Sequence, residues 1–214
     1  MVCENVGAMR VDLRATVMDW LRRVWDRSVP PQLLEQMADR PPEGDRKNRR
    51  RKWEGIPFAQ WADINRTERI ISIEPLSGQG IVQREDEGYV IYLAPDADDE
   101  AMGRALLEAL DKSRFIWPRD EPQFFEWPRY VQLYQNWQKD FMRRYGYKTK
   151  REAYKNMDWC RIRRSEGKIS IQPHDRVKPE QWEWLPADRN VVIPATTDAK
   201  AVGAALRLAL SRCG

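Results

Sequence analysis

The sequence repeats itself at an offset of 100 residues, and this repeat constrains the fold more than any other feature. Residues 98–110 match residues 198–210 at seven of thirteen positions. The matched residues are Asp98, Ala101, Gly103, Ala105, Leu106, Ala109 and Leu110 with Asp198, Ala201, Gly203, Ala205, Leu206, Ala209 and Leu210. Upstream, residues 71–75 recur as residues 169–173, and the apolar run 90–93 has its counterpart in residues 190–193. We therefore expect two pseudo-repeats, at about residues 61–118 and 157–214, each in the order strand, loop, strand, helix.

The strands of these repeats are marked by alternation and by proline. Both repeats contain Ile-Ser-Ile, the period-two pattern of a half-buried strand. Because proline has no N–H to donate, we expect the strands to end at Pro75 and Pro173. A hairpin is also indicated, since residues 158–164 alternate, residues 165–167 can turn and residues 168–172 return as an antiparallel strand.

The helix that closes each repeat is predicted by its start and by its apolar stripe. Asp98 and Asp198 can accept hydrogen bonds from the free N–H groups of a first helical turn, and Ala and Leu follow at helical spacing on one face. Gly103 and Gly203 lie inside these helices, where each costs about 0.5–1 kcal/mol relative to Ala. We expect a neighbouring backbone to approach closely at both glycines.

Two further helices are expected outside the repeats. Residues 128–145 carry apolar side chains near helical spacing, and Gly146 can end this connecting helix. Residues 11–27 predict an N-terminal helix before Pro30 and Pro31, and a basic linker occupies residues 40–52. The expected architecture is α+β, with residues 1–60 as N-terminal helix and basic linker and residues 61–214 as a two-repeat domain.

Composition excludes several classes of protein. Hydrophobic residues make up 42% and charged residues 33% of the chain, which is typical of a globular fold and not of disorder. No apolar run reaches the roughly 20 residues that span a bilayer, and the N-terminus lacks an export signal. We therefore expect no membrane partner and a cytoplasmic location.

The sequence contains no recognisable catalytic, metal-binding or cofactor-binding group of residues. Cys3, Cys160 and Cys213 form no CxxC pair, so neither structural zinc nor a disulfide framework is predicted. The single histidine, His174, follows Pro173 and is expected in a polar surface loop. Gly78-Gln79-Gly80 lacks the third glycine of a phosphate-binding loop and is interpreted as a turn. We expect a protein that is not an enzyme, has no cofactor and works by binding another macromolecule.

Charged and aromatic segments are the candidates for that binding. Acidic residues gather at 85–87 and 96–100, where helix capping and solvation compete with a role in partner binding. Trp182 and Trp184 can serve either the core or an interface. Basic segments 46–52 and 143–151, the second with interleaved tyrosines, favour the alternative of a nucleic-acid-binding module. The oligomeric state stays open.

Part of the sequence resembles a known family, the bacterial contact-dependent growth inhibition immunity proteins (CdiI). The segments that carry the resemblance are Tyr145–Arg151, Lys155–Met157, Cys160, Ile169–Pro173, Trp182, Gly203–Ala209 and Ser211–Cys213. In the first half, Tyr89–Pro95 with Gly103, Ala105, Leu106, Leu110, Ser113 and Arg114 is similar to the family's first repeat. The resemblance covers about residues 65–214, and residues 1–60 have no counterpart in it.

The resemblance implies a non-enzymatic protein that binds the toxic C-terminal domain of its cognate effector and blocks the active site of that toxin. Such toxins are commonly nucleases, often acting on transfer RNA. The implied fold is similar to Whirly domains, with two antiparallel sheets and a helix closing each pseudo-repeat. Toxin contacts are not implied residue by residue, because these interfaces are specific to each pair.

A charge argument nevertheless selects candidate toxin contacts. A cleft that holds RNA phosphates is basic, so acidic loops would complement it, although the net charge of +4 runs against this as a bulk quantity. The predicted toxin-binding residues are Glu85, Asp86, Glu87, Asp96, Asp98, Asp99, Trp182 and Trp184.

Overall fold

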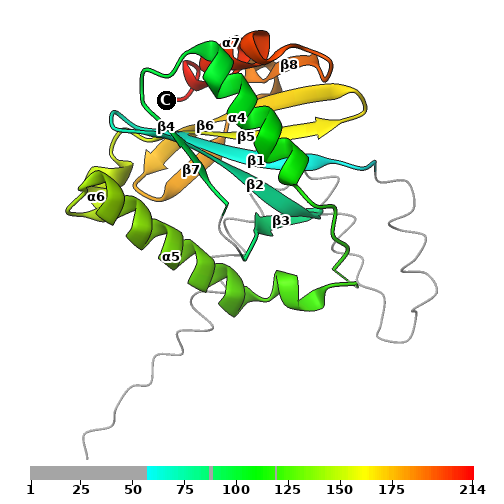
Figure 1. Cartoon of the computed structure of the whole chain (residues 1–214). Helices are drawn as coiled ribbons and strands as arrows, with labels where there is room; N and C mark the ends of the chain where they lie inside the picture. Colours follow the sequence, from blue (N-terminus) through cyan, green and yellow to red (C-terminus); the bar gives the residue numbers. More distant parts are fainter. Residues whose placement is uncertain (1–56, 87–88, 119) are drawn as a thin grey trace, which may run out of the picture. The chain divides into compact units, whose positions relative to one another are not determined.

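The computed structural model describes residues 57–86, 89–118 and 120–214 (Figure 1). Gly55–Gly214 forms one compact unit. The expected helix at residues 11–27, the basic linker at residues 40–52 and Glu87 all lie outside the described residues.

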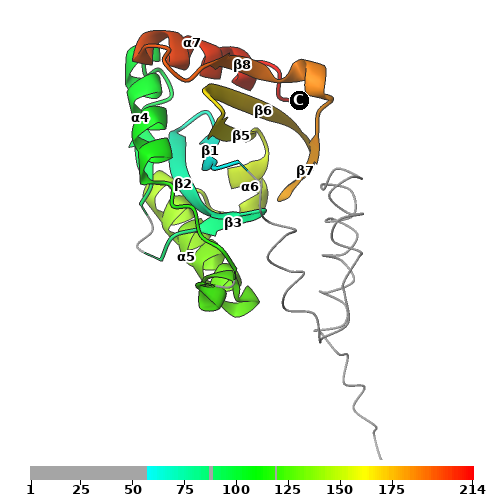
Figure 2. The same cartoon turned by 90° about the vertical axis from the view of Figure 1, so that its right-hand side faces the viewer.

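Among the described residues of this unit, eight strands form the centre, and every strand pair is antiparallel. The strands are β1 (Gln60–Arg66), β2 (Ile71–Gln79), β3 (Ile81–Arg84), β4 (Ile91–Leu93), β5 (Asp158–Ser165), β6 (Lys168–Lys178), β7 (Gln181–Trp184) and β8 (Val191–Pro194). The main path of the sheet is β3-β2-β1-β5-β6-β7, while β4 pairs with β2 and β8 pairs with β6. Figure 2 shows how this sheet curls. Strands β1–β4 precede helix α4 (Asp99–Lys112) and strands β5–β8 precede helix α7 (Ala199–Leu210), so the element order is the same in both halves.

The two strands expected to end at proline continue through it. β2 runs past Pro75 to Gln79, and β6 runs past Pro173 to Lys178, so that expectation is wrong. The pairing explains why the prolines are tolerated. Along one edge of β2, residues 71–73 pair with β4 and residues 76–79 pair with β3. Along the same edge of β6, residues 168–171 pair with β8, and the pairing with β7 begins at residue 174. Each proline therefore lies at a gap on one edge of its strand, where no N–H is required.

Other local predictions are confirmed. β5 and β6 form the expected hairpin, in which Glu166 and Gly167 turn the chain with φ values of 49° and 71°. The side chain of Asp98 accepts a hydrogen bond from the Ala101 N–H at 2.8 Å, and Asp198 caps α7 through Ala201 in the same way at 3.0 Å. The α+β class is confirmed as well.

Helices α4 and α7 pack against each other at the two repeated glycines, as expected. A Cβ atom at Gly103 would lie 1.7 Å from the carbonyl oxygen of Ala199, and one at Gly203 would lie 1.7 Å from that of Asp99. Each glycine thus admits the first turn of the opposite helix. This close approach compensates for the low helix propensity of glycine.

Two hydrophobic clusters lie on opposite faces of the sheet. Alternate residues of β4 show this, because Ile91 and Leu93 contact the cluster that includes α4 and α7 whereas Tyr92 contacts the second cluster. The second cluster lies under α5 (Trp127–Tyr145), which is the expected connecting helix and ends at Gly146 with φ 69°. It also includes residues of the short helix α6 (Lys150–Tyr154). The 3-10 helices η1 (Pro122–Phe125) and η2 (Ala187–Arg189) complete the unit.

Candidate partner-binding surface

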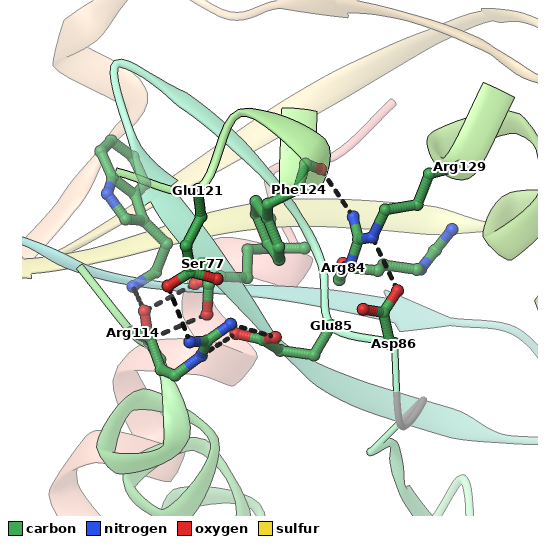
Figure 3. Close-up of polar contacts among 11 residues, drawn as sticks. Ser77, Arg84, Glu85, Asp86, Arg114, Glu121, Phe124 and Arg129 are labelled. Atoms are coloured by element: carbon green, nitrogen blue, oxygen red, sulfur yellow. Dashed lines mark hydrogen bonds and ion pairs between the residues drawn. The ribbon is translucent and has the colours of Figure 1, made fainter. Parts of the chain in front are cut away.

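The first group of predicted acidic residues lies at the end of β3, where two arginines from other elements hold it (Figure 3). Arg114, just beyond α4, donates to both carboxylate oxygens of Glu85, with Nε–Oε1 and Nη2–Oε2 distances of 2.8 and 2.9 Å. Burial raises the pKa of Glu85, but the hydrogen bonds from Arg114 and Ser77 outweigh it, so the pKa is lowered overall. Glu85 therefore stays ionised and attaches the end of β3 to the segment after α4.

Asp86 is fixed by the second arginine and still faces solvent. Arg129 of α5 donates to Asp86 at 2.6 Å, and the same guanidinium donates to the carbonyl oxygens of Phe124 and Arg84 at 2.8 and 2.9 Å. The side chain of Arg129 is only 14% exposed, whereas that of Asp86 is 72% exposed. Asp86 is thus held in place by Arg129 while its carboxylate faces solvent.

The second acidic group lies at the other end of α4. Asp98 caps the helix, and Asp99 accepts a hydrogen bond from Arg207 of α7 at 2.7 Å. Asp96 is exposed. Because α4 has 14 residues, a helix of this length separates the two acidic groups by roughly 21 Å. The structure thus does not bring all the predicted carboxylates together.

The two predicted tryptophans are half-buried on β7. The Trp182 ring packs edge-on against Tyr154 and Trp159, with centroid distances of 5.8 and 5.6 Å. Trp184 packs against His174 at 4.5 Å. Much of the surface of both rings is therefore buried inside the protein, and their role at an interface stays a prediction.

His174 is not in a surface loop, so this expectation is wrong. It belongs to β6, is 1% exposed and stacks on Trp159 at a centroid distance of 3.8 Å. Burial lowers the pKa of His174 to about 3. The side chain is accordingly neutral and serves the core.

The basic and aromatic segment 143–151 offers cations but few accessible rings. Tyr147 is buried and donates its hydroxyl to Thr67 at 2.8 Å. Arg143 and Arg144 pair with Asp140, which follows from their spacing on α5. Lys148, Lys150 and Arg151 lie beyond the end of α5 and are exposed, and Lys150 pairs with Glu180 at 3.4 Å. The second basic segment, 46–52, lies outside the described residues.

Sequence reasoning missed an exposed tryptophan at the start of α5. Trp127 is the first residue of α5, is 39% exposed and contacts the ring of Tyr130 at 5.2 Å. It lies two positions before Arg129, which binds Asp86. The signal in the sequence is that Trp127 precedes the apolar stripe of α5 and is followed by Pro128, so it is not required for the core. An exposed tryptophan is a side chain often found at the centre of protein interfaces.

Among the described side chains, no group of three or more His, Cys, Asp or Glu could hold a metal ion. In the part of the chain that the structure covers, no helix is long and apolar enough to cross a membrane.

Comparison with known proteins identifies the family. Immunity protein CdiI-YPIII of Yersinia pseudotuberculosis serotype O:3 (strain YPIII) is 32% identical over 172 residues, which cover 74% of this chain and 97% of that protein. A solved structure of a protein of unknown function, NMB0488 from Neisseria meningitidis, matches with a TM-score of 0.69 and 33% identity, covering 74% of this chain and 97% of that one. A chain of the CdiA-CT/CdiI toxin and immunity complex from Yersinia pseudotuberculosis matches with a TM-score of 0.68 and 30% identity, covering 73% of this chain and 98% of that one. Residues 60–213 match the family model described as CDI immunity protein. The chain therefore belongs to the CdiI family of immunity proteins.

Proposed function

We propose that this chain binds the C-terminal toxin domain of its cognate CdiA effector and inactivates it by covering its active site. One observation carries the proposal, namely the likeness to a chain of a toxin and immunity complex, over 98% of that chain and at 30% identity. We further propose that the toxin is a nuclease, acting on transfer RNA, and that the immunity protein itself catalyses nothing. The resemblance of the sequence to its family supports both of these finer points.

We place the toxin contact at the Asp86 end of α4. Asp86 is exposed and held in place by Arg129, so little conformational entropy is lost when a partner binds it. Trp127, at the start of the same helix as Arg129, is an exposed aromatic side chain that can add apolar contact. Among the other predicted contacts, Glu85, Asp98 and Asp99 already bind groups within the protein, and Asp96 is the exposed alternative at the far end of α4.

The binding proposal is tested with the toxin domain encoded beside this chain. We expect the full chain to form a complex with it at sub-micromolar concentration by isothermal titration calorimetry. Absence of a complex at micromolar concentration would remove the proposal. The nuclease point is separate, because intact transfer RNA in the presence of toxin alone would remove that point and leave the binding proposal standing.

The contact surface has its own test. Asp86→Lys should weaken binding at least tenfold and slow association at low salt, because a carboxylate facing a basic cleft becomes a cation. Asp188→Lys makes the same charge change at an exposed residue of η2 and should alter the affinity less than twofold. Equal effects of the two variants would exclude the Asp86 surface while leaving toxin binding intact.

The alternative of a nucleic-acid-binding module receives less support from the structure. Base stacking on segment 143–151 needs accessible rings, and Tyr147 is buried. We expect the chain alone to shift neither RNA nor DNA in a gel at low ionic strength. A shift that weakens steeply with salt would favour the alternative.

We also propose that the two halves are copies of one ancestral unit in a Whirly-like arrangement. The support is the shared element order, the paired prolines at equivalent gaps and the reciprocal glycines of α4 and α7. Superposition of β1 and β2 on β5 and β6 should place α4 on α7.

A further inference from the structure

Two free cysteines far apart in the sequence meet between the sheet and the C-terminal tail. Cys160 lies on β5, is fully buried and belongs to the cluster of core residues under α4 and α7. Cys213 follows α7 and is half-buried. The two sulfur atoms are 3.6 Å apart, although 53 positions separate the residues. The two thiols are not joined covalently, and this distance allows a hydrogen bond between them.

Hydrogen bonds on both sides of Cys213 hold it in this position. Arg212 donates to the carbonyl oxygens of Arg189 and Asn190 at 2.7 and 3.2 Å. The N–H of Arg176 donates to the carbonyl oxygen of Gly214 at 3.0 Å. The Cys213 thiol itself donates to the carbonyl oxygen of Trp159 at 3.4 Å. The contact of the two sulfurs is therefore a property of the ordered tail.

We propose that Cys160 and Cys213 form a reversible disulfide when the protein meets a peroxide. The sulfurs need to approach by about 1.5 Å to reach the bond length of a disulfide. Cys213 can make this movement, because it lies beyond α7 and belongs to no helix or strand. Cys160 stays fixed in the strand.

The accessibility of the two thiols sets the order of the chemistry. Cys213 is half-exposed, so its thiolate attacks one peroxide oxygen, the O–O bond breaks, and the leaving oxygen takes up a proton and departs as water. Cys160 then attacks the sulfenic sulfur, the S–S bond forms, the S–O bond breaks and the second water leaves. Two thiols thus lose two electrons and two protons, and the peroxide becomes two molecules of water.

The electrostatics of the pair agree with this order. The Cys160 thiol donates a hydrogen bond that lowers the pKa of Cys213, against the opposing effect of burial. The same contact, with burial, raises the pKa of Cys160. Cys213 is accordingly the better nucleophile, and Cys160 is suited to resolve the sulfenic acid.

The disulfide would fasten α7 to the sheet. It closes a loop of 53 positions, and a crosslink of that length restricts the unfolded chain strongly. For a domain of this size the expected rise in Tm is on the order of 10 °C.

The experiment uses the full chain with Cys3→Ser, which removes the third thiol. After treatment with hydrogen peroxide we expect the intact mass to fall by two hydrogen atoms, a tryptic peptide to link Cys160 with Cys213, and Tm to rise. Dithiothreitol should reverse all three changes. The matched variant, Cys3→Ser with Cys213→Ser, should show no linked peptide and no rise in Tm.

Two results would overturn the proposal. One is a gain of oxygen mass without a linked peptide, and the other is an equal rise in Tm in the Cys213→Ser variant. The proposal does not need a Cys160→Ser variant, which changes a fully buried core position. It is also independent of toxin binding, since no toxin is present in the assay.

Discussion

At the scale of single residues, Arg84 and Glu74 form a buried ion pair beneath α5. Arg84 donates to both carboxylate oxygens of Glu74, and its guanidinium lies over the Trp137 ring at 4.3 Å. The Glu74 side chain is 3% exposed. Burial lowers the pKa of Arg84, but the charge and hydrogen bonds of Glu74 outweigh it and raise the pKa overall. Each charge is thus stabilised mainly by the other.

Breaking this pair should be far more costly than breaking an exposed one. Arg84→Met leaves a buried carboxylate unpaired and should lower the free energy of unfolding by about 3–5 kcal/mol in urea titrations. The control is Arg104→Met, whose pair with Glu100 joins side chains that are 69% and 50% exposed; it should cost under about 1 kcal/mol. Adding Glu74→Leu to Arg84→Met should recover part of the loss, since no charge is then buried alone.

His174 makes a separate prediction about pH. Its pKa is about 3 in the folded protein, against 6.5 for an ordinary histidine. Between pH 6.5 and pH 3 the unfolded chain binds a proton at His174 that the folded protein does not bind. The contribution of the neutral His174 to the free energy of unfolding is therefore complete above pH 6.5 and is lost as the pH falls. The loss should be about 1.4 kcal/mol per pH unit.

The measurement compares wild type with His174→Phe, which keeps a ring between Trp159 and Trp184. Urea titrations between about pH 6.5 and pH 5 should give a steeper decline for the wild type, because most carboxylates titrate below this window. Parallel declines would show that His174 does not contribute.

At the scale of elements, the sequence predicted those features whose causes lie close together in the chain. The caps at Asp98 and Asp198, the turn at residues 165–167 and the stop at Gly146 each depend on a few neighbouring residues. The continuation of β2 through Pro75 depends instead on where β3 and β4 end along it. Such a gap is set by tertiary pairing and has no local signal.

The glycines of α4 and α7 allow a test of helix packing. Gly103→Ala should lower the free energy of unfolding by about 3 kcal/mol, since its Cβ would overlap the Ala199 carbonyl oxygen despite the better helix propensity of alanine. Gly203→Ala should behave alike because of the Asp99 carbonyl oxygen. The control, Ala204→Leu, enlarges an exposed position of α7 and should change stability by under about 0.5 kcal/mol. A neutral Gly103→Ala would contradict the packing.

At the scale of the whole molecule, the sequence indicated the family and the fold class but only part of the candidate surface. Acidic loops can be found from composition, and Glu85 and Asp86 lie in one. Their arginine partners, Arg114 and Arg129, are 29 and 43 positions away. No sequence pattern links residues that lie so far apart in the chain. Only the structure therefore shows that Glu85 is held within the protein, whereas Asp86 faces solvent.

The family match covers only part of the chain. The family model matches residues 60–213, so residues 1–54 lie outside it. Gly55–Gly214 forms a compact unit, so a chain cut at Gly55 should fold, keep the Tm of the full chain within a few degrees and bind the toxin domain within about threefold of its affinity. Calorimetry of both chains with one toxin preparation measures this. A shortened chain that unfolds cooperatively but no longer binds would place part of the toxin contact in residues 1–54, and the proposed Asp86 surface would then be insufficient by itself.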